Sequence, residues 1–154
     1  MATILILNGP NLNLLGVREP ETYGSKTLAD LQAFCADSAA QWGLRSIFHQ
    51  SNHEGFLLDR LHEARLSTGD EPCVGVVINA GALTHTSIAL HDAIKGVRPL
   101  PVIEVHLSNV FARESFREHS WIAPAALGSI CGFGFEGYRL AISVLAGQHR
   151  EPAS

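Results

Sequence analysis

Blocks of apolar residues separated by amphipathic stretches predict five short strands and four helices along this chain. The apolar, β-branched runs are typical of strands buried on both faces, and they cover residues 3–8, 44–50, 73–79, 101–106 and 127–133. Apolar residues at helical spacing predict helices over residues 28–42, 54–68, 87–95 and 136–146. Thr27 is placed to cap the first helix and Gly43 to end it. Residues 107–124 are expected to be mostly irregular.

The regular alternation of strands and helices predicts a parallel sheet with helices on both faces, because each connection crosses back over one face of the sheet. Five strands of this length favour a flavodoxin-like, doubly wound α/β fold, which is a three-layer sandwich. The 154 residues suit a single domain, 1–154, and no repeat, low-complexity tract or linker divides them.

Composition narrows the class of protein. The charged fraction is only 17%, which leaves uncharged surface suited to packing against another copy of the chain, so a homo-oligomer is expected. A net charge of -4 with scattered Lys and Arg argues against a nucleic-acid partner. No apolar stretch approaches the roughly 20 residues that span a bilayer, and the N-terminus has no basic signal region. We therefore expect a cytoplasmic protein with no membrane partner.

Cysteine and histidine patterns give no sign of a metal site. Cys35, Cys73 and Cys131 are odd in number and far apart, which is typical of small buried hydrophobic residues. No CxxC, HExxH or HxxEH spacing occurs, so no metal is expected, and without a GxSxG turn a serine hydrolase is not expected either. Six histidines are interpreted as structural or surface residues: His49, His53, His62, His91, His119 and His149.

Unusual polar residues gather just after the ends of three predicted strands. Ligands of doubly wound sheets bind beyond the carboxyl ends of the strands, near the point where the strand order reverses. Residues 8–26, 50–54, 79–87 and 106–120 should therefore surround the binding site. The polar residues in these segments include Asn8, Asn11, Asn13, Arg18, Tyr23, Asn79, His85, His106, Ser108, Arg113 and Arg117.

The connection after the first strand, from Gly9 to Gly24, is far longer than the usual two to six residues, which is typical of a lid or binding loop. It carries no phosphate-binding glycine motif. Within it, the guanidinium of Arg18 is close enough in sequence to favour the phenolate of Tyr23. A surface arginine with a tyrosine that fills the loop fits the same spacing.

The segment after the third strand allows two interpretations for each polar residue. Asn79 either bonds a substrate hydroxyl or shapes the turn, and His85 either binds a ligand or caps the next helix. Asp92, inside that helix, is either a solvated charge or a group that faces another subunit.

Glu104 and His106 lie two residues apart on the fourth strand, so their side chains point to the same side. A carboxylate beside a histidine sets its tautomer and charge, which suits a general acid. A core histidine satisfied by an acid is the alternative. The N–H groups of Leu107 and Ser108 would form a nest for a carboxylate, and Arg117 adds a donor for an anion or hydroxyl.

Several of these segments together resemble the type II 3-dehydroquinate dehydratase family (type II dehydroquinase). The resemblance is carried by LNGPNLNLLGVREPETYG at 7–24, INAG at 78–81, LTHTS at 83–87, IEVHLSN at 103–109, RESFREHS at 113–120 and Gly137-Tyr138. These motifs follow one another in order over nearly the whole chain, without a large insertion.

The resemblance implies a lyase that removes water from 3-dehydroquinate to give 3-dehydroshikimate, by anti elimination through an enolate. It implies no metal, no cofactor and no Schiff base. Tyr23 would be the base at C2, stabilised as tyrosinate by Arg18. His106, oriented by Glu104, would be the acid that protonates the departing hydroxyl at C1. Asn11 would position a water near the enolate oxygen.

The resemblance also implies a set of binding groups and an assembly. Asn79, His85 and Arg117 would hold substrate hydroxyls, and the backbone N–H groups of Leu107 and Ser108 the carboxylate. Asp92 would reach into a neighbouring subunit's site, in a dodecamer of four trimers. The pathway is left open between aromatic amino acid biosynthesis (the shikimate pathway) and quinate catabolism.

A non-enzymatic flavodoxin-like module is the competing class of protein. A receiver domain needs acidic residues at the ends of the first and third strands, where this chain has Asn8 and Asn79. An FMN binder would be yellow on purification, so colourless protein would exclude it. A structural subunit with an inactive site is the remaining alternative.

Overall fold

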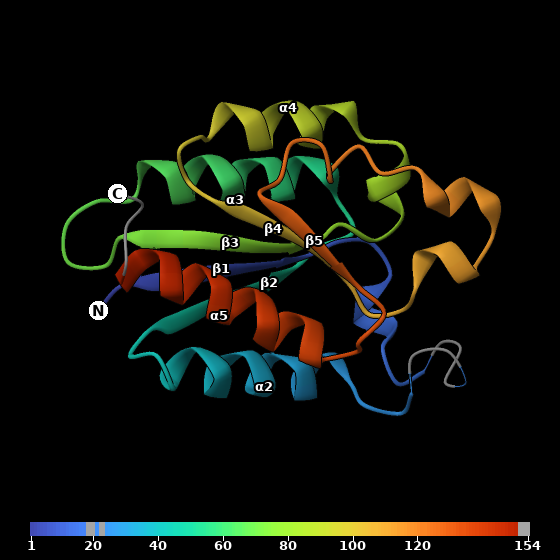
Figure 1. The fold of residues 1–154 in the computed structure, drawn as a ribbon, viewed down its shortest axis with the longest axis horizontal. Helices are drawn as coiled ribbons and strands as arrows, with labels where there is room; N and C mark the ends of the chain where they lie inside the picture. The colour runs from blue at the N-terminus through green and yellow to red at the C-terminus, as the bar shows by residue number, and fades with distance from the viewer. Residues whose placement is uncertain (18–20, 22–23, 151–154) are drawn as a thin grey trace.

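A five-stranded parallel sheet organises the computed structural model, which describes residues 1–17, 21 and 24–150 (Figure 1). Its order is β2-β1-β3-β4-β5. The strands are β1 (Thr3–Asn8), β2 (Arg45–Gln50), β3 (Cys73–Asn79), β4 (Val102–His106) and β5 (Gly128–Cys131). Strand order reverses between β1 and β3, so the predicted flavodoxin-like, doubly wound arrangement is confirmed.

Four longer helices cover the two faces of the sheet: α2 (Leu28–Ala40), α3 (Glu54–Leu66), α4 (Ile88–Gly96) and α5 (Glu136–Arg150). The pair α2 and α5 lies on one face, and the pair α3 and α4 on the other (Figure 1). Alternate residues of β1 serve the two layers: Ile4 and Ile6 pack toward α2 and α5, whereas Leu5 and Leu7 pack toward α3 and α4. Both faces of the strand are buried, which explains its continuous apolar run.

All nine predicted elements form, and the differences lie at their ends. The capping box of Thr27 and Asp30 starts α2 as predicted, and Gly43, at φ 72°, lies in the turn that follows the helix. Strand β5 is shorter than predicted because Gly132, at φ 95°, takes the chain out of extended geometry. Helix α5 continues past residue 146 to Arg150, whose guanidinium donates to the carbonyl of Trp42 and lies over its ring.

Short 3₁₀ helices occupy segments that the sequence predicts as loops. They are η1 (Leu12–Leu14), η2 (Gly81–His85), η3 (Val110–Ala112) and η4 (Ser115–Glu118). The last two lie within residues 107–124, so this region is more ordered than predicted. No helix of the described part of the chain is both long and apolar enough to cross a membrane.

The loops after β1 and β3 are in direct contact, and two glycines make this possible. A Cβ on Gly9 would lie 2.4 Å from the carbonyl oxygen of Ala80. Gly81 has φ 58°, and a Cβ there would lie 2.8 Å from the carbonyl oxygen of Pro10. Any larger residue at either position would push the two loops apart. The two glycines therefore allow the loops at the carboxyl ends of the two central strands to lie in contact.

The three cysteines are free thiols rather than disulfide partners. Cys35 is buried in the core between α2 and the sheet, and burial raises its pKa to about 12. Cys73 and Cys131 are only partly buried, so the prediction of a fully buried residue holds for Cys35 alone.

Candidate active site

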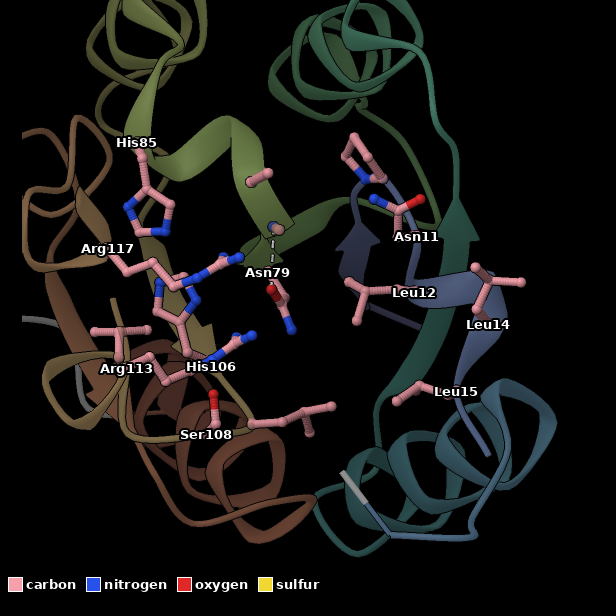
Figure 2. Close-up of a pocket in the computed structure, with 15 residues that line it drawn as sticks. Asn11, Leu12, Leu14, Leu15, Asn79, His85, His106, Ser108, Arg113 and Arg117 are labelled. Carbon is pink, nitrogen blue, oxygen red and sulfur yellow. Dashed lines mark hydrogen bonds between the residues drawn. The ribbon is translucent and has the colours of Figure 1, made fainter. Parts of the chain in front are cut away.

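A pocket opens at the carboxyl end of the sheet, where the loops after β1, β3 and β4 meet. Figure 2 shows its polar side, with His85, His106, Arg113 and Arg117, facing an apolar side that contains Leu12, Leu14 and Leu15. The remaining lining residues are Pro10, Asn11, Asn79, Gly81, Ala82, Leu107, Ser108 and Val110. The pocket lies where the strand order reverses, as the fold predicts for a ligand site.

The Glu104–His106 pair lies on β4 beneath this pocket. Both residues are buried, at 2% and 7% exposure, and His106 Nε2 lies 2.8 Å from Glu104 Oε2. The prediction that the two side chains share one side of the strand is confirmed. His106 also lines the pocket, so it is more than a core histidine satisfied by an acid.

Two serines complete the coordination of the Glu104 carboxylate. Ser120 Oγ donates to Oε2 at 2.7 Å, and Ser129 Oγ donates to Oε1. Burial is the strongest single influence and raises the pKa of Glu104, but the hydrogen bonds and charge of His106, together with both serine hydroxyls, hold that pKa below its ordinary value. We call these four residues the glutamate network. The sequence analysis did not identify either serine as a partner of Glu104, because they lie 16 and 25 residues away along the chain.

A second, uncharged network joins the ends of β1 and β3. Tyr138 of α5 is fully buried, and its hydroxyl donates to Asn8 Oδ1 at 2.7 Å and accepts from Asn79 Nδ2 at 3.0 Å. Asn79 Oδ1 in turn accepts from the Gly81 N–H, drawn as a dashed line in Figure 2. Burial raises the pKa of Tyr138 far above its ordinary value, so its hydroxyl stays protonated. We call Asn8, Asn79 and Tyr138 the tyrosine network.

The tyrosine network answers part of the question that the sequence left open for Asn79. Its side chain shapes the turn through Gly81, and the residue also lines the pocket. Contact with a substrate hydroxyl stays a prediction.

His85 lines the pocket and does not cap the next helix. The cap of α4 is Ser87, whose hydroxyl accepts from the Leu90 N–H, so the capping alternative for His85 is wrong. His85 Nδ1 bonds the carbonyl oxygen of His119 at 2.8 Å, and the ring stacks on Phe116. Because a carbonyl only accepts, Nδ1 carries a proton, and a neutral His85 has Nε2 available as an acceptor.

Two arginines bring positive charge to the same side of the pocket. Arg117 is paired with Glu114 and lies over the Phe116 ring, with 4.9 Å between the guanidinium carbon and the ring centroid. Arg113 lines the pocket too, and the sequence analysis gave it no role of its own. Guanidinium groups in this position favour a ligand with carboxylate or hydroxyl oxygens.

The remaining lining residues include three that the sequence predicted. Leu107 and Ser108 follow directly on β4, next to His106. Asn11 has a left-handed backbone, at φ 71°, and its N–H donates to Asn52 Oδ1 at 3.0 Å. Asparagine tolerates this conformation better than most residues, which explains its position at the start of η1.

Four predicted site residues are not placed in the lining of this pocket, and one of them, Glu104, lies beneath it as the partner of His106. Asp92 is exposed on α4 and does not line the pocket of its own chain, so its contact with a neighbouring subunit stays a prediction. Arg18 and Tyr23 lie outside the described residues. None of the six histidines interpreted as structural or surface residues is among the described residues that line the pocket.

Within residues 1–17, 21 and 24–150, no group of three or more His, Cys, Asp or Glu side chains is arranged to hold a metal ion. The chemical groups that the pocket does contain are a carboxylate-paired histidine, two guanidinium groups and an oriented amide. Together they define a flavodoxin-like protein with a pocket for acid–base chemistry on a small, oxygen-rich molecule.

The chain belongs to the class II dehydroquinase family. Residues 2–146 match the sequence model of this family, described as "Dehydroquinase class II". The 3-dehydroquinate dehydratase of Rhodopseudomonas palustris (strain TIE-1) is 62% identical over 144 residues, which cover 94% of this chain and 92% of the relative. That of Marinomonas sp. (strain MWYL1) is 58% identical over 147 residues, covering 94% and 96%.

Solved structures of the family have the same fold. The type II dehydroquinase from Butyrivibrio crossotus DSM 2876 is 42% identical with a TM-score of 0.88, over 94% of this chain and 97% of that one. The type II dehydroquinase from Propionibacterium acnes is 41% identical with a TM-score of 0.86, over 94% and 96%. The resemblance seen in the sequence is confirmed, and the chain is an enzyme of this family rather than a receiver domain or an FMN carrier.

Proposed function

We propose that this enzyme removes water from 3-dehydroquinate to give 3-dehydroshikimate, by anti elimination through an enolate and without a metal, a cofactor or a Schiff base. The observation that carries the proposal is the buried Glu104–His106 pair beneath a pocket lined by Arg113 and Arg117. The relatives are named 3-dehydroquinate dehydratase, which supports the substrate and the loss of water.

In the first step, Tyr23 acts as a tyrosinate base and takes the proton from C2. The electron pair of the C–H bond forms the enolate with the neighbouring ketone, and Arg18 stabilises both the tyrosinate and the developing charge. Asn11 holds a water near the enolate oxygen. The position of Asn11 on the pocket wall supports this role.

In the second step, the enolate electron pair forms the ring double bond, and the bond between C1 and its hydroxyl breaks. His106 gives a proton to the departing oxygen, so that water leaves. After these steps Tyr23 has gained one proton and His106 has lost one. Transfer of a proton from Tyr23 back to His106 restores the enzyme. The carboxylate of Glu104 stabilises His106 in its charged form before the transfer.

Substrate binding is assigned to the groups around the acid. Asn79, His85 and Arg117 hold hydroxyls, and the backbone N–H groups of Leu107 and Ser108 hold the carboxylate. The support is that all five residues line one pocket with His106.

The deciding experiment follows the ultraviolet absorbance of the conjugated product formed from 3-dehydroquinate. Wild-type enzyme should remain active after treatment with a chelator and after treatment with borohydride, whereas Tyr23→Phe should bind ligand but not turn it over. Inactive, well-folded wild-type protein would contradict the reaction. Retention of most activity in Tyr23→Phe would remove Tyr23 as the base.

The assembly is proposed as a dodecamer of four trimers in which Asp92 reaches a neighbouring site. The support is that Asp92 is exposed on α4, where another subunit could contact it. Asp92→Ala should weaken assembly, measured by sedimentation, or raise KM. If both stay unchanged, the role across subunits is wrong.

A further inference from the structure

The hydroxyl of Ser120 has a single possible direction for its proton. Its oxygen accepts from the N–H groups of Ile122 and Ala123, at 3.1 and 3.0 Å, and lies 2.7 Å from Glu104 Oε2. A serine hydroxyl has one proton and two lone pairs. Both lone pairs are used by backbone N–H donors, so the proton must point to Glu104.

The other carboxylate oxygen is held from the edge of the sheet. Strand β5 pairs with β4 so that Ser129 lies directly opposite Glu104, and its hydroxyl donates to Oε1. Oε2 also accepts from His106 Nε2. Both carboxylate oxygens therefore accept hydrogen bonds. The side chain is also buried, since Glu104 is only 2% exposed.

This arrangement opposes protonation of Glu104. A proton on Oε2 would face the Ser120 hydroxyl, which cannot turn without abandoning two backbone donors, and a proton on Oε1 would face Ser129. Leaving such buried groups without partners is unfavourable. The carboxylate is therefore kept as an acceptor, and the ring nitrogen that it contacts must carry the proton.

We propose that Ser120 and Ser129 are positioning residues that keep Glu104 an acceptor, so that His106 retains a proton on Nε2 throughout and exchanges protons with the pocket only through Nδ1. Under the proposed function, which this inference deepens, His106 enters the reaction as imidazolium, gives up its Nδ1 proton and ends as the neutral Nε2–H tautomer.

The other titratable groups around the pair are consistent with this assignment. The Cys131 thiol on β5 lies opposite His106, and burial, followed by the charge of Glu104, raises its pKa, so it stays neutral. Arg113, Arg117 and His85 share the pocket with His106.

The proton positions can be measured directly on the substrate-free enzyme. Proton–nitrogen correlation NMR of the histidine rings distinguishes the two neutral tautomers and the imidazolium, and His106→Gln identifies the His106 signals by their loss. Across the pH range of the folded protein, wild-type His106 should change only between imidazolium and the Nε2–H tautomer. A neutral Nδ1–H tautomer would overturn the proposal.

The serines are tested by Ser120→Ala, Ser129→Ala and the double variant. In the double variant, part of His106 should be neutral at a pH at which the wild-type ring is imidazolium, because Glu104 now takes the proton. Ser38→Ala is the matched control, since Ser38 is a buried serine that donates only to the carbonyl of Phe34. Unchanged His106 spectra in a folded double variant would overturn the role of the serines.

Kinetics give an independent measurement. In the double variant kcat should fall about 10-fold to 100-fold, as expected for lost hydrogen bonds to a charged group, with little change in KM. Ser129→Thr keeps the hydroxyl and should preserve both kcat and the His106 spectra, whereas loss of both would contradict a hydrogen-bonding role. If no variant acts on 3-dehydroquinate, the proposed function fails, yet the spectra still decide where the protons are.

Discussion

The glutamate network and the tyrosine network lie beneath the same pocket and are both buried, but they are built for different tasks. The glutamate network pairs an imidazole with a carboxylate whose pKa is held below its ordinary value by the hydrogen bonds that it accepts. The tyrosine network contains two amides and a phenol whose pKa burial raises far above its ordinary value, so no proton leaves it. One network controls charge, and the other only controls position.

The comparison shows that a buried charged group and a buried neutral group need different sets of hydrogen-bond partners. A buried charge is unfavourable unless donors surround it, and Glu104 receives three, from His106, Ser120 and Ser129. A buried neutral group needs only complementary partners, and the single hydroxyl of Tyr138 supplies one donor and accepts one hydrogen bond. Substitutions in the two networks should therefore affect different measurements.

The largest effect is expected for His106, the proposed acid. Under the proposed mechanism, His106→Ala removes the group that protonates the leaving hydroxyl, and kcat should fall by roughly 10²–10⁴, the usual contribution of a general acid. The measurement is steady-state turnover of 3-dehydroquinate. His62→Ala, on the exposed surface of α3, is the control and should leave kcat unchanged. Comparable activity of both variants would exclude His106 as the acid.

The next effect is expected for the carboxylate. Glu104→Gln keeps the shape but removes the charge, and its amide N–H₂ would oppose one of the three donors. We expect kcat to fall about 10-fold to 100-fold, in line with a lost charged hydrogen-bond partner, while ligand affinity stays close to that of the wild type. A fall in affinity without a fall in kcat would mean that Glu104 supports binding rather than proton transfer.

A substitution in the tyrosine network should mainly affect stability. Tyr138→Phe leaves Asn8 Oδ1 and Asn79 Nδ2 without their shared partner, which should lower the free energy of unfolding by about 2–4 kcal/mol. Chemical denaturation measures this loss. The pH profile of kcat should keep its shape, because no titrating group is removed. A shifted profile would contradict the division between the two networks.

The smallest effect is expected in the pH dependence of stability. The pKa of Glu104 is lowered in the folded protein from an ordinary value of 4.5, so its ionised form stabilises the fold above that value. This contribution should be lost as the pH falls below 4.5 and through the folded value. Chemical denaturation at a series of pH values from neutral to acid measures this contribution. The free energy of unfolding should fall less steeply with decreasing pH in Glu104→Gln than in the wild type. Equal slopes would contradict a lowered pKa for Glu104.

Much of the fold was predictable because its signals are local. The continuous apolar runs of β1 and β3 predict buried parallel strands, and the two-residue spacing of Glu104 and His106 predicts a pair on one side of β4. The helix cap at Thr27 was predictable because its hydrogen bonds are made with Asp30, three residues along the chain. The family motifs were also readable, because each is a contiguous segment.

What only the tertiary structure decided are the partners that lie far apart along the chain. Ser120 and Ser129 reach Glu104 across 16 and 25 residues, and Tyr138 reaches Asn79 across 59. Ser120 and Tyr138 lie within segments that resemble the family, but no local pattern predicts the partners of these serines or this tyrosine, since those depend on strand pairing and on the packing of α5. The sequence by itself determined the fold class, the family and the Glu104–His106 pair, because periodicity and motifs are local. The donors that control the charge of that pair were decided only when folding brought β4, β5 and the loop after η4 together.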